Sequence, residues 1–276
     1  MRIIRDATQL AKKVFFSCCV LCNRLISQRG VPVFLYHSID ATGSPISTHP
    51  DNFHWQMRYL YGRGWRTMRL DELLDALKSR RLPKKRFVIT FDDGFKNLLT
   101  AALPVLKEFG FTATVYLATE FVGRTNSYVK VVMPSLPMLS WDDLRILRGT
   151  GWDIESHGHT HRNLTDLDMS QAHWELAVSR DHIRKNLGVI PKHFCYPRGR
   201  YSMPVVGAVR AAGYQSAASF RSGLVRPSSN PWLLERLPVN DRATPLHFRA
   251  LLTEPYAWIT ALRRGFRQLL KRDDLY

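Results

Sequence analysis

The chain has 276 residues, of which 45% are hydrophobic and 23% charged, a composition that excludes an intrinsically disordered protein. This length fits a single α/β barrel and can bury a large core without disulfides. The formal net charge of +17 favours an anionic membrane surface or an acidic substrate, whereas the lack of a nucleic-acid-binding motif argues against nucleic acid as a partner.

Residues 1–30 predict a basic amphipathic helix. Basic residues such as Arg2, Arg5 and Lys12 fall largely outside one apolar stripe at helical spacing, which is made of Ile4, Ala7, Ala11, Val14, Cys18, Leu21 and Leu25. Such a helix can lie in a membrane interface or pack on the domain, and the sequence leaves both alternatives open.

The N-terminus and the cysteines bear on the cellular compartment. The apolar stretch Val14–Cys22 is too short to span a bilayer, and no A-x-A cleavage site follows it. The four cysteines form no spaced disulfide framework, and Cys19 and Cys22 are interpreted as small apolar helix residues rather than a redox pair. We therefore expect a cytoplasmic protein attached peripherally to the inner membrane; it is periplasmic if residues 1–30 act as a signal or anchor.

Apolar strand-like runs alternate with helical patterns from residue 31 onward, which predicts a parallel sheet covered by helices. The predicted strands are Val33–Tyr36, Trp65–Met68, Phe87–Phe91, Thr112–Ala118, Trp152–Glu155, His193–Tyr196 and Tyr214–Ala218. The predicted helices are Asn52–Tyr61, Leu70–Lys78, Leu98–Phe109, Asp142–Arg148, Met169–Leu187 and Pro204–Ala212. About seven such units would close a barrel, whose site forms at the carboxyl ends of the strands.

Two further segments complete the predicted organisation. Residues 119–139 form a long loop of the kind that serves as a lid or a binding loop. The stretch Pro245–Arg272 predicts helices interrupted near Pro255, with an apolar face that either contacts a membrane or packs on the domain. We therefore predict an N-terminal helix (1–30), a barrel domain (31–243) and a basic helical extension (244–276).

The first motif whose residues could take part in catalysis or metal binding is Thr90–Gly94, which contains two adjacent acids at a strand end. Because side chains alternate along a strand, Asp92 and Asp93 point in different directions. One carboxylate can then bind a metal while its neighbour faces a bound water; the alternative is a solvated Asp-Asp-Gly turn.

The second motif, Ser156–His161, holds three histidines in five residues. One helical turn would place His157 and His161 on one face, where their imidazoles and one aspartate suit zinc or a similar transition metal. The alternative is a set of ordinary surface or core histidines. His159 is a third ligand, a substrate contact or, in the interpretation we favour, an ordinary loop residue.

Two weaker motifs follow other strand ends. The segment Phe194–Tyr201 predicts a rigid loop that could wall a sugar pocket and offer backbone N–H groups to an oxyanion. Tyr36-His37-Ser38 places His37 level with the other motifs, as either a structural or a catalytic histidine.

Together these motifs resemble the NodB-homology polysaccharide deacetylases, carbohydrate esterase family 4, over roughly residues 31–240. The resemblance implies a distorted (β/α)7 barrel. It also implies that Asp92 is the general base and that Asp93, His157 and His161 hold a divalent metal, foremost Zn²⁺, with Co²⁺ or Ni²⁺ as alternatives. Tyr196, Pro197, Arg198 and Gly199 would contact the substrate, with the Tyr196 N–H as oxyanion donor.

The sequence departs from the family pattern at two places. In the third motif, Cys195 and Arg198 stand where the family has Arg and Tyr, and the family's late catalytic histidine has no evident match after Leu237-Pro238. Read strictly, both departures would suggest an inactive copy. The poly-N-acetylglucosamine deacetylase subgroup, which the chain resembles, has an early Tyr-His pair instead. This resemblance assigns the general-acid role to His37.

The predicted function is metal-dependent removal of N-acetyl groups from an amino sugar in a polysaccharide or glycan. Two alternatives remain open. One is deacetylation or deformylation of a lipid-linked, undecaprenyl-phosphate amino sugar, and the other is a catalytically degenerate protein that binds glycans.

Overall fold

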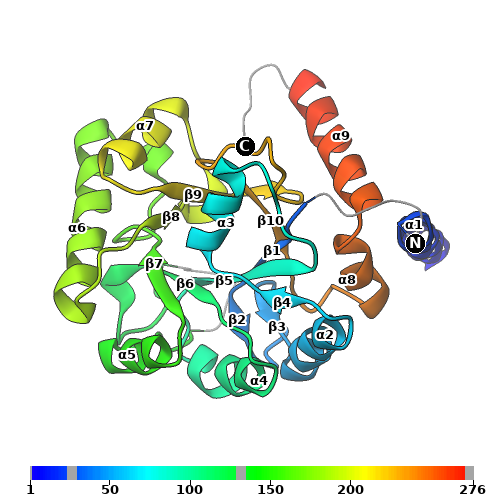
Figure 1. Cartoon of the computed structure of the whole chain (residues 1–276), viewed down its shortest axis with the longest axis horizontal. Coiled ribbons are helices and arrows are strands. Elements are labelled where there is room, and N and C mark those ends of the chain that lie inside the picture. The colour runs from blue at the N-terminus through cyan, green and yellow to red at the C-terminus, as the bar shows by residue number, and fades with distance from the viewer. Residues whose placement is uncertain (1, 24–29, 129–134, 271–276) are drawn as a thin grey trace.

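The computed structural model describes residues 2–23, 30–128 and 135–270. Neighbouring strands pair in parallel, and β5 pairs back with β1 to close a barrel (Figure 1). Around the barrel the strands are β1 (Val33–Tyr36), β10 (Leu234–Pro238), β9 (Ser216–Ser222), β8 (His193–Cys195), β7 (Asp153–Ser156), β6 (Thr114–Leu117) and β5 (Arg86–Asp93). The predicted seven-strand α/β barrel is therefore confirmed.

The identity of one barrel strand differs from the prediction. The predicted strand Trp65–Met68 is the short β4 (Arg66–Thr67), which pairs only with the start of β5 and lies outside the closed ring. The missing barrel strand is β10, which the sequence did not predict. Two further short strands, β2 (Ser38–Ile39) and β3 (Ser47–Thr48), pair with each other.

Helices surround the barrel, and one of them closes its amino-terminal end (Figure 1). The surrounding elements are α2 (Pro50–Gly62), a π-helical turn (Leu98–Ala102) leading into α4 (Leu103–Glu108), α5 (Trp141–Gly149), α6 (Met169–Leu187), α7 (Met203–Ala211) and α8 (Pro245–Leu251). The helix α3 (Leu70–Lys78) instead buries its four leucines in one cluster with Val33 and Val88, near the start of β1 and β5. The carboxyl end of the barrel is thereby left for a site.

Two long helices lie at one side of the barrel (Figure 1). They are α1 (Arg2–Cys22) and α9 (Glu254–Leu270), and both contact α8. Phe248 of α8 is fully buried and stacks on Phe34 of β1, with ring centroids 5.2 Å apart. None of the helices in the described segments is long and apolar enough to cross a membrane.

Candidate active site and metal centre

The two acids of the first motif stand at the carboxyl end of β5, on a backbone that turns sharply. Asp93 has a left-handed backbone (φ 74°) and Gly94 has φ 95°, and the Gly94 N–H donates to the Asp92 carbonyl at 2.9 Å. A Cβ at Gly94 would lie 2.7 Å from Cδ1 of Leu117, so glycine is required here. Both carboxylates are buried, and each meets different partners.

Asp93 meets the two outer histidines of the second motif. Its Oδ1 lies 3.2 Å from Nε2 of His161 and 3.5 Å from Nε2 of His157. The ligand atoms of these three residues all lie within 4.8 Å of one another. The structure thus brings together the three residues that the family resemblance selected, and their role as metal ligands stays a prediction.

The state of these three side chains fits a divalent cation. Nδ1 of His157 donates to the Cys195 carbonyl at 2.8 Å, which leaves the Nε2 lone pair facing Asp93. Burial lowers the pKa of His157 to about 4 against the opposing pull of Asp92, so this imidazole is neutral near pH 7. Oδ1 of Asp93 is buried and, within the described residues, makes no hydrogen bond. Two imidazoles and one carboxylate are a donor set that zinc prefers.

The loop that carries the histidines is held by Glu175 of α6, which the sequence did not single out. Its buried carboxylate accepts from the backbone N–H groups of His159 (2.7 Å) and Thr160 (2.9 Å) and from the Thr160 hydroxyl. These bonds fix a loop in which His161 has a left-handed backbone (φ 57°). The signal in the sequence is a glutamate at a position of a long helix that faces the core. A buried carboxylate there needs hydrogen-bond partners from another segment.

Asp92 is held by Arg236, another residue that the sequence pattern did not single out. The guanidinium donates to both carboxylate oxygens, with Nη1–Oδ1 at 2.7 Å and Nη2–Oδ2 at 2.9 Å. Both side chains are almost completely buried. Burial opposes ionisation of Asp92, but Arg236 and then His157 outweigh it and keep the pKa of Asp92 below its usual range. Asp92 is therefore ionised and held in one orientation.

Arg236 also explains the departure at Cys195. The Cys195 thiol lies 3.0 Å from Nη2 of Arg236 and donates to Oδ2 of Asp92 at 3.4 Å. The guanidinium beside Asp92 thus comes from Arg236 in β10, while β8 has the small residue Cys195 at the position where the family has Arg. Burial raises the pKa of Cys195, so the thiol is protonated and is a poor ligand in the neighbouring cluster of Asp92, His157 and Cys195.

His37 and Tyr128 border the same acids from two loops. His37 is half-buried between β1 and β2, and it stands level with Asp92 because Tyr36 pairs with Phe91 in the register of β1 and β5. Tyr128, in the predicted binding loop 119–139, places its ring 4.3 Å from that of His161. Burial and then Asp93 raise the pKa of Tyr128, which keeps its hydroxyl protonated. Part of this loop, residues 129–134, lies outside the described residues.

The third motif forms a wall, but one expectation about it is wrong. The Tyr196 N–H donates to the Ala218 carbonyl at 3.1 Å, and its hydroxyl donates to the Trp232 carbonyl at 3.1 Å. Neither group is free to act on a substrate oxyanion, because β8 pairs with β9 as far as this residue. Pro197 has no N–H, so the next backbone donor along the chain belongs to Arg198, whose side chain is exposed and whose φ is 53°.

Phe220 links this wall to the other motifs. A Cβ at Gly199 would lie 2.4 Å from Cδ2 of Phe220, whose ring centroid is 6.4 Å from that of His37. His159, by contrast, turns away from the metal ligands. Its Nδ1 bonds to the Thr119 hydroxyl at 2.9 Å, and its ring packs against Trp174 and His182.

The chain is similar in sequence to known polysaccharide deacetylases. The polysaccharide deacetylase family model matches residues 79–217, half of the chain. The poly-β-1,6-N-acetyl-D-glucosamine N-deacetylase of Staphylococcus aureus (strain MRSA252) is 27% identical over 71% of this chain and 69% of its own length. The putative polysaccharide deacetylase YxkH of Bacillus subtilis (strain 168) is 26% identical over 80% of this chain and 76% of its own.

Solved structures support the fold. IcaB from Ammonifex degensii superposes with a TM-score of 0.72 at 22% identity, over 82% of this chain and 99% of that one. The Streptococcus pyogenes deacetylase PplD gives 0.71 at 21% identity, over the same shares. With the motifs assembled at the end of such a barrel, the chain belongs to the polysaccharide deacetylase family.

Proposed function

We propose that this protein hydrolyses the N-acetyl group of an N-acetylglucosamine residue in a polysaccharide. The observation that carries this proposal is the division of labour between adjacent acids, since Arg236 holds Asp92 while His157 and His161 face Asp93. The named activity of the Staphylococcus aureus relative indicates the sugar.

Asp92 acts as the general base in this proposal. The bidentate bond to Arg236 keeps the carboxylate ionised and fixed, so that it can accept a proton from the attacking water. Arg236 lowers the pKa of Asp92, so the carboxylate is a weaker base but is held in one orientation. A tethered carboxylate beside a buried histidine pair suits the hydrolysis of an unactivated amide.

Asp93, His157 and His161 would hold a divalent cation, with Zn²⁺ favoured by the donor set and Co²⁺ or Ni²⁺ as alternatives. Such a cation supplies Lewis acidity towards the amide carbonyl oxygen and towards water. The Nδ1–H of His157 is bonded to a carbonyl and so fixes which ring nitrogen faces Asp93.

His37 is the proposed general acid, which protonates the departing amine. It follows Tyr36, which pairs with Phe91 in the register of β1 and β5, so it stands level with Asp92 at the carboxyl end of the barrel. His247, the next histidine after β10, stacks on Phe16 of α1. The backbone N–H of Arg198 is proposed as the donor to the oxyanion, in place of Tyr196.

A lipid-linked amino sugar is the second candidate substrate, favoured by exposed apolar residues on α1. The test is acetate release from poly-β-1,6-N-acetylglucosamine and from an undecaprenyl-phosphate N-acetyl sugar, with and without a chelator. Chelator-sensitive release from the polymer supports the first candidate. Release from the lipid-linked sugar alone supports the second, and release from neither contradicts both.

A further inference from the structure

The helix α1 packs on the C-terminal helices through one face. Phe16 stacks on His247 of α8, with ring centroids 4.4 Å apart, and Cys19 is only 2% exposed. The Asn23 side chain, just beyond α1, accepts from the Glu254 N–H of α9 at 3.1 Å. These contacts define which side of α1 belongs to the domain.

The opposite face of α1 is apolar and exposed. Leu10, Val14 and Leu21 are 64%, 55% and 58% exposed, and Cys18 between them is also exposed. At about 100° per residue, these side chains fall in one narrow sector away from Phe16 and Cys19. Ala11, Val14, Cys18 and Leu21, the members of the predicted apolar stripe whose side chains the structure describes, therefore lie on the face that the domain does not cover.

The neighbouring helix adds to this exposed apolar surface. Trp258 and Leu262 of α9 lie one turn apart and are 44% and 69% exposed. Tryptophan is enriched where proteins meet the interface of a bilayer. Exposed apolar residues at this density on two contacting helices indicate a surface that binds a partner.

A band of basic side chains follows on from α8. Arg249 of α8 lies over the Tyr59 ring of α2 at 5.9 Å, and from there hollows of about 370 and 460 Å³ run along the surface. Their cations, here called the basic band, are Arg58, Arg63, Arg66, Lys84, Lys85 and Arg86. In the described part of the chain none of these six pairs with a carboxylate.

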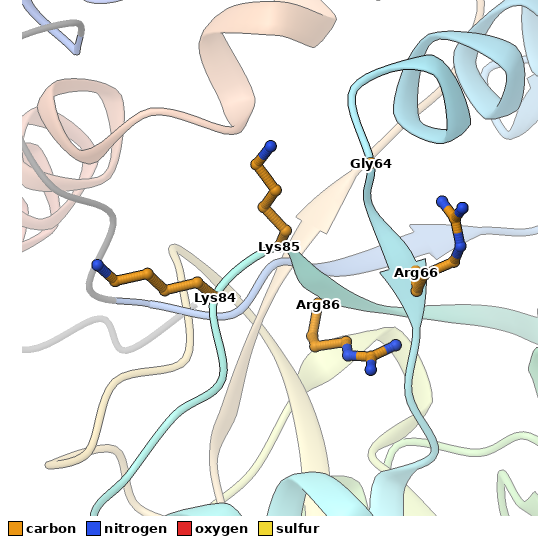
Figure 2. Close-up of a pocket in the computed structure, with 5 residues that line it drawn as sticks. All are labelled: Gly64, Arg66, Lys84, Lys85 and Arg86. Atoms are coloured by element: carbon orange, nitrogen blue, oxygen red, sulfur yellow. The ribbon is translucent and has the colours of Figure 1, made fainter.

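The cations of the larger hollow point away from one another (Figure 2). Lys84, Lys85, Arg66 and Arg86 fan out over the surface rather than converge on one point, as a site for a single phosphate would require. Divergent cations suit an extended anionic surface, in which headgroups are spread over an area.

We propose that the exposed face of α1, with Trp258 and Leu262, docks on an anionic lipid membrane, to which the basic band is attracted. A second copy of the chain fits this face less well. A two-fold contact would bring together two molecules that each carry a formal net charge of +17, which disfavours a dimer through this face.

Flotation of the full chain with vesicles tests this proposal. Vesicles of phosphatidylcholine with phosphatidylglycerol should bind the protein, pure phosphatidylcholine should bind it poorly, and salt should weaken binding. The double variant Val14→Glu, Leu21→Glu should bind at least about tenfold more weakly, because two apolar side chains no longer enter the bilayer. The matched control is Ile146→Glu, Ile190→Glu, whose positions are 52% and 54% exposed elsewhere.

The basic band is tested in the same assay. Lys84→Glu, Arg86→Glu should reduce binding and its salt dependence, whereas the equal charge change Lys107→Glu, Arg210→Glu should have a smaller effect. Thermal unfolding confirms that each variant is folded. The proposal is overturned if the wild-type protein does not bind anionic vesicles, or if the variant Val14→Glu, Leu21→Glu binds them as well as the wild type does. A dimer in light scattering that Val14→Glu, Leu21→Glu dissociates, without vesicle binding, would overturn it in favour of a second copy.

Discussion

The pairing of Arg236 with Asp92 shows how this chain keeps its proposed base in place. An arginine and an aspartate that are both almost completely buried stabilise each other only while both are present. The guanidinium comes from β10 and the carboxylate from β5, two strands that flank β1. One ion pair therefore links the geometry of the site to closure of the barrel.

Replacing Arg236 should destabilise the fold and shift the pH dependence. Arg236→Gln should lower the free energy of unfolding by about 3–5 kcal/mol, because Asp92 is left as an unpaired buried charge. The pKa of Asp92 should rise, so activity should be lost at a higher pH on the acidic side. Denaturant titration and a pH–rate profile measure both. The double variant Asp92→Asn, Arg236→Gln should recover stability, and wild-type stability of Arg236→Gln alone would contradict the assignment.

The metal ligands can be separated from their neighbour by metal content. We expect Asp93→Ala, His157→Ala and His161→Ala each to abolish stoichiometric metal binding, because each removes one of three convergent donors. His159→Ala should retain the metal, since its ring faces Thr119 and Trp174. Elemental analysis of the purified variants decides the matter, and a fully loaded His157→Ala protein would disprove the ligand set.

At the scale of elements, the sequence predicts the strands and helices whose hydrophobic pattern is regular. The ranges Val33–Tyr36, Leu70–Lys78 and Met169–Leu187 match the observed elements residue for residue. The carboxyl ends of parallel strands meet at one edge, which predicts that the acids of the first motif and the histidines of the second lie close together. The choice of Asp93 rather than Asp92 as the partner of His157 and His161 came from the resemblance to the deacetylase family.

The strand that the sequence does not predict has a charged side chain buried in the barrel. β10 reads Leu-Glu-Arg-Leu-Pro, and its buried Arg236 breaks the apolar pattern on which strand prediction depends. Glu175 and Tyr128 contact residues from other segments of the chain, so a local pattern can mark the residue but cannot identify its partner. The Tyr196 N–H is unavailable because β8 pairs with β9, which depends on register rather than on residue type.

Glu175 allows the contribution of α6 to be measured. Glu175→Ala should weaken metal affinity by about 10–100-fold, because the histidine loop loses three hydrogen bonds that fix its conformation. Gln171→Ala, at an exposed position of the same helix, is the control. Metal titration by calorimetry measures the difference, and equal affinities for the two variants would show that the loop does not depend on Glu175.

At the scale of the molecule, the two ends of the barrel have different tasks. Its amino-terminal end is filled by the leucines of α3, and its carboxyl end carries the acids and histidines. Stability can therefore be probed away from the site. His193 in β8 is buried, with Nδ1 2.9 Å from the Ser216 hydroxyl and Nε2 3.2 Å from Asp71.

Acidification should destabilise the protein through His193. Burial lowers the pKa of His193 to about 4, although Asp71 opposes this, whereas an unfolded histidine has a pKa of about 6.5. The stabilisation is thus present above the unfolded value and is lost as pH falls from about 6.5 to 4. Through this one group, the free energy of unfolding should fall by about 2 kcal/mol between pH 7 and pH 5. His193→Asn should show a shallower decline in denaturant titrations, and an equally steep decline would contradict this origin.

Acetate release from poly-β-1,6-N-acetylglucosamine tests the central claim most directly. Wild-type protein should release acetate, while Asp92→Asn and His37→Ala should each keep the metal and the fold but lose about two to four orders of magnitude in rate. The wild-type pH–rate profile should be bell-shaped, and its basic limb should disappear in His37→Ala. A His37→Ala enzyme with an unchanged rate and profile, or an active Asp92→Asn enzyme, would contradict the proposed pair of base and acid.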